Sequence, residues 1–155
     1  KVFSYIPQFK QNKFFAQLFQ AIRIEVNQEL EVLKEMLLQS YKILKKEGID
    51  DPVLFGAICA HNPKSGVKAK TKIQYALLAA DPMSGFLKAV AQIYPDKKIA
   101  SVKRKSVIKR FNEARFAKGA NRDYMESIEF TGLMLEDLID IGLEEMCAIS
   151  DELGL

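Results

Sequence analysis

Apolar residues recur at intervals of three and four in the first third of the chain, and this spacing constrains the fold more than any other feature. Between residues 14 and 46 they are Phe15, Leu18, Phe19, Ile22, Val26, Leu30, Leu33, Leu37, Tyr41 and Leu44. Such spacing places one apolar stripe along an α-helix. The pattern predicts a long amphipathic helix, or two in sequence, ending at Gly48, because glycine readily adopts the left-handed conformation of a helix cap.

The rest of the chain shows helical spacing and no alternation typical of strands. The predicted helices cover residues 52–61, 71–80, 83–94, 101–116, 122–130 and 135–153. Pro82 is expected to kink or break its helix, with Asp81 capping the second half, and Ser101 is expected to cap the basic helix that follows. We therefore predict an all-α fold, a single-domain irregular helical bundle over residues 1–155.

Length and composition support a folded protein. A chain of 155 residues suits one domain, and 48% apolar with 28% charged residues is close to the globular average. No apolar run approaches the length of a membrane span. The two cysteines, Cys59 and Cys147, lie in apolar helical patterns. They predict buried free thiols and a reducing, cytoplasmic setting.

Charge is divided sharply between two adjacent segments. Residues 97–118 hold nine Lys or Arg and one Glu, a net charge of +8, whereas residues 119–155 hold one Arg and ten Asp or Glu, a net charge of −9. A basic segment is a candidate contact for nucleic acid. The adjacent acidic segment would pair with it or repel phosphate, so nucleic acid is not the expected partner, and an RNA-binding module through residues 97–118 is an alternative hypothesis.

The sequence completes no recognisable catalytic site. His61 is the only histidine, and neither Cys59 nor Ser65 has a nucleophile motif around it. No glycine-rich phosphate loop is present, so no catalytic residue and no cofactor are assigned. His61 and Asp81 are the candidate metal ligands, an imidazole and a carboxylate on neighbouring helices. A hydrolytic metal generally takes at least three protein ligands, so this pair alone is incomplete.

Most of the chain from about residue 41 to residue 155 resembles one known family. The runs that carry the resemblance are residues 61–63, 75–85, 95–98, 102–107, 116–122 and 148–155. They resemble the C-terminal half of the HD-type metal-dependent phosphohydrolases. The resemblance implies that His61 stands among the later histidines of that family and that Asp81 is its closing metal ligand. The family's first histidine and its adjacent His-Asp pair have no counterpart, so the resemblance implies the fold of the second half without the activity.

The N-terminal portion resembles a different family. Residues 9–30, in a match that runs to about residue 48, are similar to a helical segment of the MraW-type ribosomal RNA cytosine-N4 methyltransferases. The S-adenosylmethionine site of that family lies largely on a Rossmann-like core that this sequence does not show. The resemblance therefore does not imply methyl transfer by this chain.

Together the two resemblances predict a chimera, methyltransferase-like over residues 1–48 and HD-like over residues 49–155. We expect an engineered or recombined helical protein without evolved catalytic function, in which the N-terminal segment completes the core of a half-domain. One alternative is a residual HD-type phosphohydrolase that uses a divalent metal on His61 and Asp81, with acids such as Glu25 or Glu29. Self-association is open, with a slight preference for a homodimer because a half-domain leaves apolar surface exposed.

Overall fold

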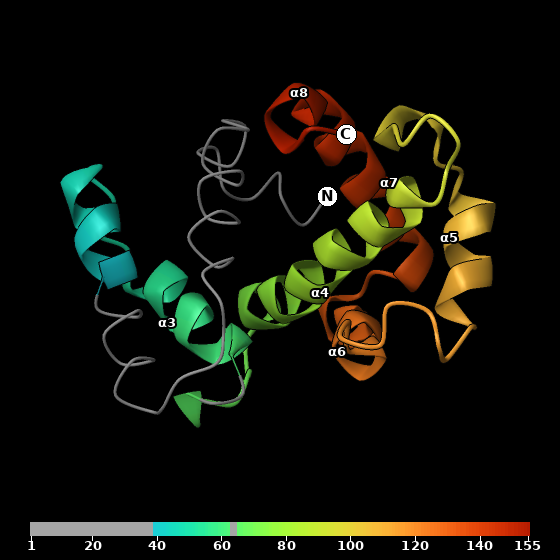
Figure 1. Ribbon diagram of the computed structural model, residues 1–155. Coiled ribbons are helices and arrows are strands. Elements are labelled where there is room, and N and C mark those ends of the chain that lie inside the picture. Colours follow the sequence, from blue (N-terminus) through green and yellow to red (C-terminus); the bar gives the residue numbers. More distant parts are fainter. Residues whose placement is uncertain (1–38, 63–64) are drawn as a thin grey trace.

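A computed structural model describes residues 39–62 and 65–155, and every regular element of this part is helical (Figure 1). Residues 39–46 form a helix that leads to the elements α3 (Pro52–His61), α4 (Lys72–Gln92), η4 (Ile99–Ser101), α5 (Arg104–Phe111), α6 (Arg122–Glu126), η5 (Ser127–Thr131), α7 (Leu135–Ala148) and α8 (Ser150–Leu153). The predicted all-α fold is confirmed. Within this part, no helix is long and apolar enough to cross a membrane. The predicted helix before residue 39 lies outside the described residues.

The start of α3 follows from the sequence Asp51-Pro52. The Asp51 carboxylate accepts hydrogen bonds from the amides of Val53, at 2.8 Å, and Leu54, at 3.4 Å. Pro52 occupies the first turn, where its missing N–H costs nothing. Gly48 has a φ of +78°, so the predicted left-handed residue after the first described helix is confirmed.

Helix α4 runs without interruption through Pro82, so the predicted break there is wrong, while the alternative of a kink stays a prediction. Asp81 is therefore an interior residue of α4 and not the cap of a second helix. Pro82 has no N–H to donate to the carbonyl of Leu78, yet the helix continues because residues on both sides of it are buried. Ala79 and Met83 are 0% and 1% exposed, so packing of this face outweighs the lost hydrogen bond.

Most of the core surrounds α4, which crosses the centre of the view in Figure 1 with α5, α6 and α7 around its C-terminal part. Its fully buried side chains include Met83, Phe86, Leu87, Val90, Val107, Met125, Ile128 and Ile139. A second cluster, which we call the α3 cluster, contains Leu44, Leu54, Ala57, Ile58 and Leu77. Because Leu77 belongs to α4, this helix contributes to both clusters.

Three predicted boundaries differ from the structure. Ser101 does not cap the basic helix; its hydroxyl donates to Asp96 Oδ2 at 2.5 Å, and α5 begins only at Arg104. α5 ends at Phe111, well before the predicted end at residue 116. The C-terminal helix is divided at Ile149, whose φ of −120° and ψ of 23° leave the helical region and separate α7 from α8.

Candidate functional site

His61 lies in the last turn of α3, where its ring is held by the helix itself. The half-buried imidazole donates from Nδ1 to the carbonyl of Ile58 at 2.5 Å. Since a carbonyl can only accept, this bond assigns a proton to Nδ1. In the neutral ring Nε2 is then the unprotonated nitrogen, the form in which histidine binds a metal or accepts a proton.

Asp81, a half-buried residue in the middle of α4, interacts electrostatically with His61. Burial raises the pKa of the Asp81 carboxyl above its usual value, and the charge of His61 acts in the opposite direction. The two residues that the sequence singled out therefore lie on helices that pack together, α3 and α4, within range of an electrostatic interaction.

The residues around this pair do not complete a metal centre. No group of three or more His, Cys, Asp or Glu that could hold a metal ion occurs within residues 39–62 and 65–155. The acids considered from sequence, Glu25 and Glu29, lie outside the described residues. His61 and Asp81 alone therefore do not supply the donor set of a hydrolytic metal, and we derive no catalytic step through one.

Ser65, which follows α3, is hydrogen-bonded to the last turn of that helix. Its hydroxyl donates to the carbonyl of Cys59 at 2.6 Å and accepts from the amide of Val67 at 3.1 Å. Ser65 is thus a structural residue that satisfies a carbonyl at the helix end. Burial raises the pKa of the Cys59 thiol, which disfavours the nucleophilic thiolate. Cys59 and Cys147 are both free, as predicted, but each is half-buried and not buried.

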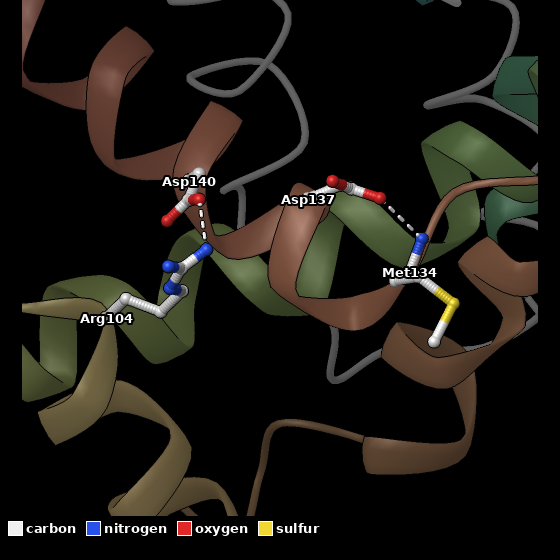
Figure 2. A network of polar contacts seen from close by, with 4 residues as sticks. All are labelled: Arg104, Met134, Asp137 and Asp140. Atoms are coloured by element: carbon white, nitrogen blue, oxygen red, sulfur yellow. Dashed lines mark hydrogen bonds and ion pairs between the residues drawn. The ribbon is translucent and has the colours of Figure 1, made fainter.

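The basic and acidic segments meet on the surface between α5 and α7. Figure 2 shows Arg104 of α5 donating to the carboxylate of Asp140 at 2.6 Å, and Asp137 of α7 accepting from the amide of Met134 at 2.8 Å. The first contact neutralises one charge of each segment, and the second caps the start of α7. Pairing between the two segments, expected from their charges, therefore occurs at this point.

Sequence reasoning missed the central role of Arg122. Its guanidinium donates to three carbonyls of the preceding loop, Phe116, Ala117 and Ala120, at 2.5 to 2.8 Å. It also lies over the rings of Phe86, at 4.8 Å from the centroid, and Phe111, at 5.8 Å. An available signal was its position directly after the helix-breaking sequence Gly119-Ala120-Asn121, where an arginine can reach back to loop carbonyls.

Comparison with known proteins gives a match over the first part of the chain. The sequence model of the MraW methylase family matches residues 1–62. Ribosomal RNA small subunit methyltransferase H is 57% identical over 44 residues in Cytophaga hutchinsonii, 69% over 39 residues in Christiangramia forsetii and 59% over 44 residues in Flavobacterium johnsoniae. These matches cover 28%, 25% and 28% of the chain and span 15%, 13% and 15% of the relatives' length. No solved structure matches.

These comparisons correct the expectation of an engineered chimera without evolved function. The N-terminal segment is similar to natural bacterial methyltransferases, and the family match continues through α3 to residue 62, beyond the join expected at residues 41–48. Contacts also cross the expected join within the matched segment: the rings of Tyr41 and Phe55 lie 4.8 Å apart. No HD-type family matches, so neither the HD resemblance nor the phosphohydrolase hypothesis that rests on it is supported.

Proposed function

We propose that this chain works in ribosomal RNA methylation, as a helical part of a methyltransferase system that binds small-subunit ribosomal RNA. The observation that carries the proposal is the 57% to 69% identity of its N-terminal segment to small subunit methyltransferases. The chain spans about a seventh of those relatives, so their activity and substrate come to it only as a proposal.

Residues 39–62, the described part of the matched segment, pack against the helices that follow, which supports a common role for the two parts of the chain. Leu44, Leu54, Ala57 and Ile58 lie within residues 1–62 and are buried against Leu77 of α4. α3 and α4 also form the most extensive contact between any two described elements. A segment buried in this way positions its exposed residues relative to the rest of the domain, so RNA bound by one part is held near the other.

The proposal of RNA binding differs from the expectation drawn from charge alone. That expectation was that the acidic segment disfavours nucleic acid. That expectation concerned residues 97–118. Within the matched segment the exposed side chains of Lys42 and Lys46 belong to the first described helix, where they can contact phosphates. A ribosomal RNA substrate agrees with the cytoplasmic setting predicted from the free thiols.

The proposal is tested by titrating the full chain into labelled fragments of small-subunit and large-subunit ribosomal RNA of equal length. We expect tighter binding to the small-subunit fragment. The double variant Lys42→Glu/Lys46→Glu should weaken it by about tenfold, because lost phosphate contacts no longer release counterions. The matched control is Lys68→Glu/Lys70→Glu, which makes the same charge change at exposed lysines outside the matched range. Equal affinity for both RNAs, or equal loss in both variants, would contradict the proposal.

A second proposal concerns His61 and Asp81, which we propose as a two-residue position for a divalent metal completed by water or by other ligands. The electrostatic interaction between the two residues and the Nδ1 proton of His61 favour this assignment, since Nε2 is then available as a ligand. Binding to the folded state must raise the midpoint of unfolding.

The metal proposal is tested by thermal unfolding of metal-stripped protein with and without Mn²⁺, Fe²⁺ or Mg²⁺. We expect a rise in the midpoint for the wild type and none for His61→Ala or Asp81→Asn. Cys59→Ala, a change of a neighbouring half-buried side chain on α3, is the control that should keep the response. A metal response that survives His61→Ala, or no response of the wild type, would show that the pair holds no metal.

Two further expectations stay predictions. One is the single domain over residues 1–155, and the other is the homodimer. Phe130 and Met134 are 67% and 59% exposed, so apolar surface is present. Sedimentation of the full chain across a concentration series checks the homodimer, and a constant monomer mass would exclude it.

A further inference from the structure

A depression that is largely open to solvent, which we call the cavity, has a volume of about 520 Å³ and lies beside the loop between α5 and α6. Its lining includes Phe111 at the end of α5, Asn112 and Lys118 in the loop, and Asn121 and Arg122 at the start of α6. Ligand sites in proteins usually have volumes of about 300–1,000 Å³, so this open cavity has room for a small molecule, part of which would stay exposed. Neither the methyltransferase proposal nor the metal proposal uses it.

Arg122 contributes a positive charge to this cavity, and the hydrogen bonds of its guanidinium group fix where that charge lies. Its half-buried guanidinium has five N–H donors, of which three are engaged by the carbonyls of Phe116, Ala117 and Ala120. Within residues 39–62 and 65–155 no carboxylate forms an ion pair with it. Carbonyl dipoles and ring faces compensate the charge in part, and two donors remain for an anion.

The surroundings add charge of the same sign. Residues 109–122 contain five Lys or Arg and one Glu, a net charge of +4. That glutamate, Glu113, is paired with Arg110 at 2.6 Å and so does not neutralise the cavity. Lys118 lines the cavity with an exposed ammonium group, which can turn toward a bound anion.

The remaining lining has both neutral donors and an apolar wall. Asn121 Oδ1 accepts from the amide of Tyr124 at 3.2 Å, so the amide nitrogen of its side chain is left as the donor end. Asn112 offers a second carboxamide. Phe111, Ala114 and Ala120 supply apolar surface beside these donors. The lining thus combines cations, amide donors and a hydrophobic wall, which suits an anionic head attached to an apolar or ring-shaped body.

We propose that this cavity binds a small phosphate monoester, with the phosphate between Arg122 and Lys118 and the organic part against Phe111. A dianionic phosphate matches the two cations, and guanidinium groups bind phosphate through directed N–H donors. The volume exceeds what a phosphate ion alone would fill, so the organic part is expected to add affinity.

The proposal is tested by calorimetric titration of the full chain with phenyl phosphate, inorganic phosphate and phenol. Phenyl phosphate should bind more tightly than inorganic phosphate, and phenol should not bind measurably. Lys118→Ala should lower the affinity for phenyl phosphate about tenfold, because one charge-assisted contact is lost. Lys68→Ala, an exposed lysine outside the cavity, is the matched control and should leave the affinity unchanged.

The variant at position 118 is exposed and outside any helix, so its fold is expected to persist and is checked by circular dichroism. Equal affinity of wild type and Lys118→Ala would overturn the proposal, as would phenol binding as tightly as phenyl phosphate. An absence of saturable phenyl phosphate binding would overturn it as well. So would an RNA oligonucleotide whose binding depends on Lys118 and is not displaced by phenyl phosphate. These outcomes are independent of the Lys42 and Lys46 variants that test RNA binding.

Discussion

Gly142 of α7 packs directly against Leu87 of α4: a Cβ atom added to Gly142 would lie 2.7 Å from Leu87 Cδ1. Leu87 is completely buried, so its side chain has little room to move away. The close approach of α7 to the central helix therefore depends on the absence of a side chain at this position.

Gly142→Ala is accordingly expected to lower the free energy of unfolding by about 1–3 kcal/mol through overpacking. Gly85→Ala is the matched control, since Gly85 is also helical but a Cβ there meets no atom within 4 Å. The control should stabilise by about 0.5–1 kcal/mol through helix propensity. Urea denaturation of both variants measures the difference, and destabilisation of the two by equal amounts would argue against the close contact.

Arg122→Leu should destabilise the domain by about 2–4 kcal/mol, because three loop carbonyls lose their donor and two aromatic rings lose a cation. Arg115→Leu, on the same loop but exposed, should change stability by less than about 0.5 kcal/mol. Denaturant titration distinguishes the two, and similar small effects would show that the carbonyl contacts of Arg122 contribute little.

Pro82→Ala should raise the free energy of unfolding by about 1–3 kcal/mol, since alanine restores an N–H that can donate to Leu78 within α4. Part of this gain is offset by the greater freedom of the unfolded chain without proline. Pro52→Ala is the control at the first turn of α3, where proline is well accommodated and the change should be small. Thermal unfolding measures both. A loss of stability in Pro82→Ala would show that the helix requires the proline ring.

Ser101→Ala is expected to raise the pKa of the Asp96 carboxyl toward its usual value. In the wild type the Ser101 hydroxyl, and next the amide of Lys98, hold the pKa of Asp96 below that value by stabilising the carboxylate. Because the folded pKa is lowered, the contact stabilises the fold above the unfolded pKa, and this contribution is lost as the pH falls through the folded pKa. Titration of the Asp96 carboxyl by NMR in both proteins measures the shift. An unchanged pKa in Ser101→Ala would show that the hydroxyl is not the cause.

The sequence predicted elements whose signals are local. Asp51-Pro52 and Gly48 act through their own neighbours, so the start of α3 and the end of the helix before it were predicted correctly. The continuity of α4 through Pro82 could not be predicted in this way. It depends on the burial of Ala79 and Met83 by distant elements, which outweighs the local preference.

The metal site assigned to His61 and Asp81 stays a prediction. His61 and Asp81 are the kinds of residue that a sequence search selects, and the packing of α3 on α4 leaves them within range of an electrostatic interaction. Arg122 was missed because its role rests on loop carbonyls and on two rings from α4 and α5, which no motif encodes. The assignment of the join failed because a helical pattern such as residues 41–48 carries no information on ancestry.

The division of the described apolar residues into two clusters means that parts of this chain are expected to open independently. The α3 cluster contains five buried residues, and the cluster around the C-terminal part of α4 contains sixteen. Local opening free energy increases with buried apolar contact. Backbone amides of α3 should therefore exchange with solvent deuterium sooner than those of residues 83–92, and the protein would pass through a state in which α3 is released while the larger cluster stays intact.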